Sequence, residues 1–322
     1  MRRLGCFGLV LVLALVAGVA LALNSWRGAG PLEANTTVLI ARGSSLSGAA
    51  SALERAGAVT SARRFVLLAR VLGDDTAIQA GEYRLAKGMS QAEILNLLQR
   101  GETLQRLVRV PEGWPSVMVH DAVMKAPQLT GSVAVPAEGS VLPDSYSYQR
   151  GDTRAEVVGR MQAAMTRYLA EAWKRRKPAT AVRTPQEAII LASIVEKETG
   201  KPEERRMVAA VYSNRLRMGM PLQADPTVIY PVTRGRPLGR RILRSELRAQ
   251  NGYNTYAMAG LPVGPIANPG RESIDAVLDP ANTDALYFVA DGTGGHVFAR
   301  TLAEHNANVA KWRAIRRARG EI

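Results

Sequence analysis

The stretch TPQEAIILASIVEKETG, residues 184–200, predicts a buried helix with clear ends. Thr184 can cap the first turn, Pro185 fits the first helical position and Glu187 completes a capping box. Gly200 is a residue type that often follows the C-terminus of a helix. The residues between these ends are mostly apolar or small, and a helix that is apolar on every side is normally buried. The larger part of the chain is therefore expected to pack around this helix.

The last turn of this predicted helix carries two carboxylates, Glu196 and Glu198. A buried carboxylate near the negative end of a helix dipole is expected to have a raised pKa, as a general acid requires. Because the two acids are two residues apart, they point to nearly opposite sides and cannot form the carboxyl pair of an ordinary glycosidase, whose members lie roughly 5–9 Å apart. The bulkier apolar residues share the face of Glu198, which favours Glu198 and leaves Glu196 as the alternative. The structural alternative is a core helix whose polar end is solvated.

The first residues predict a membrane anchor. Residues 4–23 carry no charge and are almost wholly apolar, and a helix of that length spans roughly 30 Å, the thickness of a hydrocarbon core. Arg2 and Arg3 precede the run and favour a cytoplasmic N-terminus. A cleaved signal peptide is the alternative, although its apolar region is typically about 7–15 residues long. We therefore assign residues 1–30 to a cytoplasmic stub, a transmembrane helix and a linker.

The composition narrows the expected surroundings of the protein. Its 322 residues carry a formal net charge of +14, which favours an anionic neighbourhood such as membrane lipid or cell-wall polymer. Aromatic residues make up only 5% of the chain, and an export signal separates the protein from nucleic acid, so no nucleic-acid partner is expected. Cys6 is the single cysteine, which excludes an internal disulfide and a cysteine metal site.

Two soluble domains are expected after the anchor, both of the α+β class. Residues 31–110 predict a small module of alternating strands and helices without a cluster of titratable residues, which suits binding, positioning or a spacer role. Residues 111–322 predict a larger domain that contains the buried helix. Its other expected elements are helices at 153–175, 203–218 and 301–319 and a strand pair at 286–290 and 296–298.

The chain has no signature of a common cofactor or metal site. It contains no Gly-X-Ser-X-Gly elbow, no phosphate-binding loop and no dinucleotide fingerprint. The spacing of His296, Glu304 and His305 fits no metal motif, so we expect no metal and no cofactor and interpret the histidines as structural. The turn at Asp225 can fix polar side chains on rigid backbone. Residues 253–256 add two aromatic rings and an amide, a mixture that suits sugar rings and their hydroxyls.

Several ordered motifs resemble those of the endolytic murein transglycosylases, the YceG-like family. They lie in the helix end, in the segments that follow it and in the first module, so the resemblance covers nearly the whole chain. The motifs are ASIVEKET at 192–199, NRL at 214–216, LQADPTVIY at 222–230, YNTY at 253–256, YFVA at 287–290, GHVF at 295–298, AGEY at 80–83 and MSQAEIL at 89–95.

The resemblance implies a single-pass inner-membrane enzyme with a periplasmic catalytic domain and a LysM-like module at residues 31–110. It implies cleavage of the β-1,4 bond between N-acetylmuramic acid and N-acetylglucosamine within nascent glycan strands, which leaves 1,6-anhydro ends and terminates elongation. Peptidoglycan strands and peptidoglycan synthases would be its partners. The family's single catalytic glutamate lies in this helix end, where Glu198-Thr199 is similar to the Glu-Ser of other lytic transglycosylases, with Glu196 as the alternative. The residues that would line the glycan cleft are Gln223, Asp225, Thr227, Tyr230, Asn254 and Tyr256.

Two other functions remain open from the sequence. A membrane-tethered scaffold could bind the cell wall and recruit synthases without cleaving glycan. A hydrolase could use Asp225 to activate water. The products distinguish the three hypotheses, because only a lytic transglycosylase releases anhydro ends.

Overall fold

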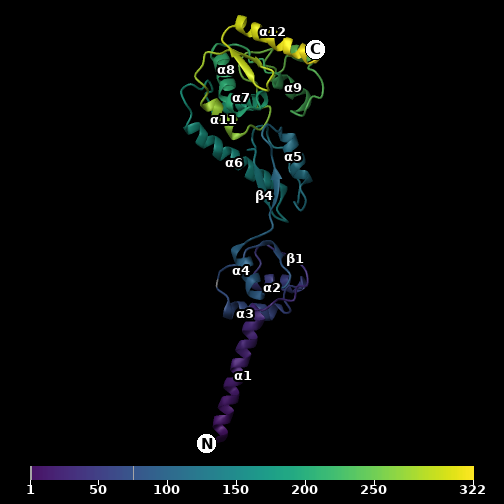
Figure 1. Ribbon diagram of the computed structural model, residues 1–322, viewed down its shortest axis with the longest axis vertical. Helices are drawn as coiled ribbons and strands as arrows, with labels where there is room; N and C mark the ends of the chain where they lie inside the picture. The colour runs from purple at the N-terminus through teal and green to yellow at the C-terminus, as the bar shows by residue number, and fades with distance from the viewer. Residues whose placement is uncertain (1, 75) are drawn as a thin grey trace. The chain divides into compact units, whose positions relative to one another are not determined.

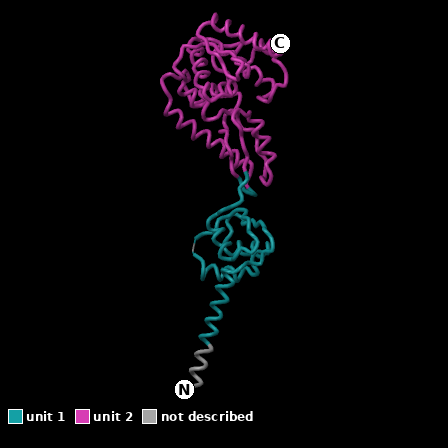
Figure 2. The backbone as a smooth tube through the Cα atoms, viewed as in Figure 1, with its two compact units in different colours: residues 1–106, 148–151 teal, residues 107–147, 152–322 magenta. Residues whose placement is uncertain are grey.

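The structure is a computed structural model that describes residues 2–74 and 76–322, with side chains from residue 11 onward (Figure 1). The chain divides into two compact units. The first contains residues 1–106 and 148–151, and the second contains residues 107–147 and 152–322 (Figure 2). No sequence feature predicted that residues 148–151 belong with the first unit.

The first unit is a small α and β module with its own core. Strands β1 and β2 pair antiparallel, with Val38 opposite Tyr83. Phe65 and Tyr83 are fully buried between this pair and the helices, and Trp26 packs against Phe65 with ring centroids 6.0 Å apart. The elements are α1 (Arg2–Arg27), β1 (Thr36–Ile40), α2 (Leu46–Arg55), α3 (Ala62–Leu72), β2 (Gly81–Leu85) and α4 (Gln91–Arg100).

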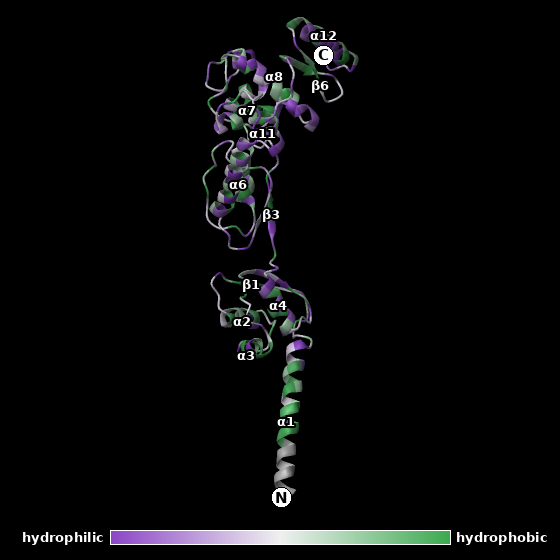
Figure 3. Ribbon diagram, turned by 90° about the vertical axis from the view of Figure 1, so that its left-hand side faces the viewer, coloured by the Kyte–Doolittle hydropathy of each residue, from purple (hydrophilic) through white to green (hydrophobic). Residues whose placement is uncertain are grey.

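Helix α1 carries exposed apolar side chains along the part whose side chains are described (Figure 3). Leu15 and Leu21 are 68% and 70% exposed. No helix in the described part of the chain is both long and apolar enough to span a bilayer. The expected span of residues 4–23 begins in residues 4–10, whose side chains lie outside the described part. The membrane anchor therefore remains a prediction, as does the LysM-like character of the first unit.

The second unit surrounds α7 with helices. The elements are β3 (Arg106–Arg109), α5 (Ser116–Lys125), β4 (Ser145–Tyr148), α6 (Arg154–Lys174), α7 (Pro185–Glu198), η1 (Pro202–Glu204), α8 (Arg205–Arg217), α9 (Asp225–Thr233), α10 (Arg244–Arg248), α11 (Arg271–Leu278), β5 (Tyr287–Ala290), β6 (His296–Ala299) and α12 (Leu302–Ala318). Strands β3 and β4 form one two-stranded sheet, and β5 and β6 form another. The chain thus mixes helices with small sheets, which confirms the mixed α and β composition predicted from the sequence.

Helix α7 is the centre of the second unit's core. Every residue from Ala188 to Val195 is buried, and the helix packs against α8 and α11 (Figure 1). Full burial of a side chain such as Leu191 stabilises the fold by about 1.5–3 kcal/mol. The hydroxyl of Ser193, the polar residue in this run, donates to the carbonyl of Ile190 at 2.7 Å and accepts from the backbone of Ile266 at 3.1 Å.

The ends of α7 differ in detail from those expected. Thr184 accepts from the backbone of Glu187 at 3.1 Å, but the Glu187 carboxylate accepts from the backbone of Arg183 instead of closing a capping box. The helix ends at Glu198, and Thr199 rather than Gly200 is the C-cap, with an extended backbone. The Thr199 hydroxyl accepts from the backbone of Lys201 at 3.0 Å, so this side chain holds the turn that the glycine was expected to form.

Candidate active site

A cavity of about 290 Å³ opens beside the last turn of α7. Helices α7, α8, α9 and α12, strand β5 and the segment before α9 all contribute to its wall. One acid, Glu198, comes from the buried helix, and another, Asp225, comes from the first turn of α9. The lining residues are Glu198, Tyr212, Arg215, Leu222, Gln223, Asp225, Tyr256, Phe288 and His305.

The Glu198 carboxyl is buried at this cavity, although the residue as a whole is half-buried. Its Oε1 has no hydrogen-bond partner among the described residues, while the Tyr212 hydroxyl hydrogen-bonds to the carboxyl. Burial, with a smaller contribution from the charge of Asp225, raises the pKa of Glu198 to about 7, against the opposing effects of Tyr212 and Arg215. A carboxyl with this pKa holds its proton in about half of the molecules at neutral pH, so it can both donate and accept a proton there.

Two residues of α8 fix the polarity of the cavity around this acid. Tyr212 is fully buried, and burial raises its pKa well above the usual value, so its hydroxyl keeps its proton and can donate to Glu198. Arg215 donates through Nε to the carbonyl of Leu286 and through Nη1 to the carbonyl of Leu222, both at 2.7 Å. Because backbone carbonyls hold the guanidinium, it brings a positive charge near Glu198 without forming an ion pair there.

The segment before α9 places two further polar groups. Asp225 accepts from the Tyr256 hydroxyl at 2.6 Å, which joins two positions 31 residues apart in the sequence. Gln223 has a φ of 55° and donates its backbone N–H to the carbonyl of Thr255 at 3.0 Å. A left-handed backbone at a residue other than glycine is uncommon and often marks a functional site. The Gln223 side chain is exposed at the cavity.

Glu196 lies outside the cavity. Its Oε2 accepts from the backbone N–H of Gly270 at 2.9 Å, at the N-cap of α11. A carboxylate is favoured at this position by the positive end of the helix dipole. The two acids therefore lie on different sides of α7, with Glu198 at the cavity and Glu196 at a helix terminus.

The six residues expected to bind substrate separate into two groups. Gln223, Asp225 and Tyr256 line the cavity with Glu198. Thr227 is fully buried and bonds to the Thr255 hydroxyl at 2.8 Å. Asn254 is also fully buried.

The other three residues hold the fold around the cavity. The Asn254 amide donates to the carbonyls of Glu246, Leu247 and Ala249 at 3.2, 3.1 and 2.8 Å. Tyr230 donates to Glu138 at 3.2 Å and lines a separate cavity of about 350 Å³. Thr227, Tyr230 and Asn254 are not among the residues that line the cavity at Glu198.

Three polar residues that line the cavity were not predicted from the sequence to belong to the site: Tyr212, Arg215 and His305. Tyr212 and Arg215 are three residues apart on α8, a spacing that places both on one face and was the available signal. His305, interpreted as structural from the sequence, stacks on Tyr287 with ring centroids 5.2 Å apart. Its Nδ1 is buried without a hydrogen-bond partner, and burial together with Arg215 lowers its pKa, which favours the neutral imidazole.

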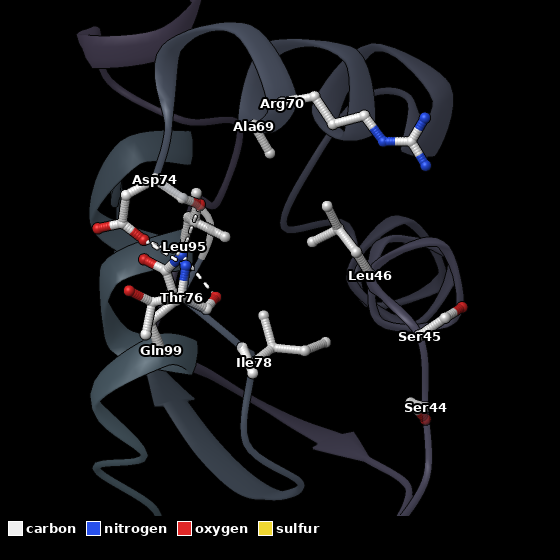
Figure 4. Close-up of a pocket in the computed structure, with 11 residues that line it drawn as sticks. Ser44, Ser45, Leu46, Ala69, Arg70, Asp74, Thr76, Ile78, Leu95 and Gln99 are labelled. Atoms are coloured by element: carbon white, nitrogen blue, oxygen red, sulfur yellow. Dashed lines mark hydrogen bonds between the residues drawn. The ribbon is translucent and has the colours of Figure 1, made fainter.

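A further cavity, of about 420 Å³, lies in the first unit (Figure 4). The apolar side chains of Leu46, Ile78 and Leu95 line it, together with Ser44 and Ser45. Among the described residues that line it, the acid is Asp74, which accepts from the backbone of Thr76 at 2.9 Å and from the Gln99 amide at 2.7 Å, and these bonds lower its pKa. The Asp74 carboxyl is therefore ionised at neutral pH.

Among residues 2–74 and 76–322, no group of three or more histidine, cysteine, aspartate and glutamate side chains is arranged to hold a metal ion. The acid–base groups of the cavity are thus Glu198, the Asp225–Tyr256 pair and a neutral His305. The fold and this site define a protein with two compact units and a buried carboxyl of raised pKa in a polar cavity.

The chain belongs to the YceG-like family, whose model matches residues 38–311. A Bacillus subtilis protein named endolytic murein transglycosylase is 30% identical over 314 residues, which cover 87% of this chain and 86% of that protein. A Streptococcus pneumoniae D39 protein of the same name is 30% identical over 334 residues, which cover 87% of this chain and 60% of that protein. The crystal structure of a YceG-like protein from Listeria monocytogenes is similar, with a TM-score of 0.53 and 28% identity, and covers 85% of this chain and 99% of that one.

Proposed function

We propose that this protein is an endolytic peptidoglycan transglycosylase. The observation that carries the proposal is the buried carboxyl of Glu198, whose pKa of about 7 suits a group that first donates and then accepts a proton. The names of the Bacillus and Streptococcus relatives support peptidoglycan as the substrate. The proposed bond is the β-1,4 linkage between N-acetylmuramic acid and N-acetylglucosamine inside a nascent strand.

The proposed reaction uses Glu198 twice. The protonated carboxyl gives its proton to the glycosidic oxygen as the bond between that oxygen and the muramyl C1 breaks. The carboxylate then takes the proton of the muramyl C6 hydroxyl, whose oxygen bonds to C1 and closes a 1,6-anhydro ring. No water is consumed, and Glu198 ends the cycle protonated.

The surroundings of Glu198 support a single-acid mechanism over hydrolysis. A hydrolase would need a second group to activate water, and Asp225 is the other acid of the cavity. Its Oδ1 accepts from the Tyr256 hydroxyl at 2.6 Å, so this oxygen is already engaged within the protein. We assign Asp225, Tyr256 and Gln223 to substrate contact and Tyr212 to the orientation of Glu198.

The test compares Glu198→Gln with Glu196→Gln on uncrosslinked glycan strands, with mass spectrometry of the products. We expect wild type to release anhydro-muramyl ends and Glu198→Gln to lose at least about a hundred-fold in rate, since general acid–base catalysis typically contributes 10²–10⁴-fold. Glu196→Gln is the matched control, because glutamine can still accept from Gly270. Activity retained in Glu198→Gln, or products with reducing ends, would contradict the assignment. Strand binding without cleavage by wild type would favour the scaffold hypothesis.

The proposal includes the membrane location expected from the sequence. The exposed apolar side chains of α1, from Leu11 to Leu23, support an anchor that continues into the preceding residues. The second unit would then act in the periplasm, where peptidoglycan synthases extend the strands that it cuts. Retention of the full chain in membranes after a salt wash, and release of the chain that lacks residues 1–30, would support this location.

A further inference from the structure

An arginine-rich segment, residues 234–248, lies between α9 and Tyr256. It contains six arginines and one acid, Glu246. Two of the arginines are neutralised within the fold. Arg236 pairs with Asp121 at 2.6 Å, and Arg240 pairs with Glu246 at 2.9 Å.

The other four arginines of the segment have no acidic partner in the described part of the chain. They are all exposed, and they are Arg234, Arg241, Arg244 and Arg248. Unpaired positive charges close together repel one another, so the segment is a region where a bound anion would be favoured.

The segment is nevertheless held in a defined conformation. Glu246 accepts from the backbone of Leu243 at 2.7 Å as well as from Arg240. The Asn254 amide binds three carbonyls at the end of α10, the first of them that of Glu246. These bonds fix α10 beside the backbone of residues 254–256.

The same backbone leads directly to the cavity at Glu198. Thr255 accepts from the backbone N–H of Gln223 at 3.0 Å, and Tyr256 lines the cavity. The arginine-rich segment therefore begins at the end of α9, whose first residue is Asp225, and ends at a loop that carries another lining residue. The segment that carries the unpaired arginines is therefore connected at both ends to elements that line the proposed active site.

Arg244 and Arg248 are four residues apart on α10, so they lie on the same face of one helical turn. Like charges at this spacing destabilise a helix when no anion is present. A planar guanidinium presents a fork of N–H donors that matches a carboxylate. The pair is suited to an anion that carries carboxylates on a flexible chain.

We propose that Arg244 and Arg248 bind the carboxylates of the peptide stems that project from the glycan strand in the cavity. The inference rests on the proposed function, because that function supplies a strand with acidic stems at this place. Stem binding beside the cavity makes the enzyme select strands that still carry their peptides. The two arginines are specificity residues and take no part in the bond cleavage.

The test measures strand binding in the full chain with the Glu198→Gln substitution, so that binding is observed without cleavage. One ligand is a fluorescent uncrosslinked strand with its peptide stems, and the other is the same strand after an amidase has removed the stems. Arg244→Gln/Arg248→Gln is compared with Arg313→Gln/Arg317→Gln. The control pair is also exposed, unpaired in the described residues and four residues apart, but lies on α12.

We expect the Arg244→Gln/Arg248→Gln protein to bind stem-bearing strands roughly ten-fold more weakly than the protein that keeps both arginines. Its affinity for stem-free strands should be unchanged. Each exposed ion pair contributes only a part of the ten-fold factor, so both arginines are replaced together. The control pair should leave both affinities unchanged. The thermal stability of the Arg244→Gln/Arg248→Gln protein should not fall, because the substitution relieves repulsion. These results together would support the inference.

Equal weakening on both strands, or equal weakening by the control pair, would overturn the inference. Vesicles of anionic phospholipid are a third ligand in the same assay, and a loss of binding confined to them would also overturn the inference, because it would assign the arginines to a membrane surface. The proposed function fails by a different result, which is that the protein with Glu198 intact does not cleave glycan strands. The two failures can therefore be distinguished.

Discussion

Glu198 couples the chemistry of the cavity to the stability of the second unit. Burial raises the pKa of this carboxyl from 4.5 to about 7, which corresponds to about 3 kcal/mol of preference for the protonated form in the folded state. Below pH 4.5 the carboxyl is protonated in both states. Between pH 4.5 and about 7 the unfolded chain ionises first, so the folded state loses stability as the pH rises. Above about pH 7 the loss is complete.

Glu198→Gln should therefore be more stable than wild type at pH 8 by about 3 kcal/mol and nearly equal to it at pH 4, because glutamine resembles the protonated acid. Urea unfolding followed by tryptophan fluorescence at the two pH values measures the difference. Glu196→Gln, whose site lies at the start of α11, serves as the control and should not gain stability at pH 8. If Glu198→Gln and wild type differed in stability by the same amount at pH 4 and pH 8, burial would not be raising the pKa of Glu198.

Besides Glu198, His305 is the residue lining this cavity that has a buried polar atom without a hydrogen-bond partner among the described residues. The Nδ1 atom is buried without a partner at the same cavity as Glu198 Oε1. Buried polar atoms are usually paired, so two unpaired atoms in one cavity indicate groups that a ligand would satisfy. His305→Phe keeps an aromatic ring against Tyr287 and removes both nitrogens.

We expect His305→Phe to lower kcat/KM on glycan strands by about ten-fold, the value of one hydrogen bond, without loss of thermal stability. The control is His120→Phe, because His120 bonds to the carbonyl of Val133 at 3.1 Å outside the cavity. Unchanged kcat/KM in His305→Phe would return this histidine to the structural role first inferred from the sequence.

At the scale of elements, the sequence predicted secondary structure best where the interactions that form it join residues close together in the chain. Helix α7 could be predicted because Thr184, Pro185 and the apolar run act locally. Its end could not be predicted in detail, since the Thr199 hydroxyl also contacts Glu204 at 3.3 Å. Glu204 in turn accepts from the His296 backbone at 2.9 Å, a contact that spans 92 residues. No local pattern contains that pairing.

The same limit explains the mixed outcome for the motif residues around α9. The resemblance assigned Gln223, Asp225 and Thr227 to the glycan cleft, but a sequence motif does not determine which of its side chains face the cavity. Thr227 turns inward because it pairs with Thr255, and Asn254 turns inward because it satisfies three carbonyls at the end of α10. These polar groups complete the hydrogen bonding of a buried loop, which depends on tertiary contacts.

At the scale of the molecule, each unit has its own apolar core. The first core contains Phe65 and Tyr83, the second contains Leu191 and Ile194, and the two clusters share no residue. Residues 148–151 join the first unit although they are distant from it in sequence, so a linear boundary describes the division only in part. Separate cores predict that a core substitution in one unit leaves the stability of the other unchanged.

Phe65→Ala and Leu191→Ala test this independence, because each side chain is fully buried in the core of its own unit. Each substitution leaves a cavity and should cost about 2–5 kcal/mol. We expect calorimetry of the full chain to resolve two transitions, with Phe65→Ala lowering one and Leu191→Ala lowering the other. A single transition that both substitutions lower equally would mean that the two units unfold together. Cleavage at Glu198 would then depend on the stability of the first unit as much as on that of the second.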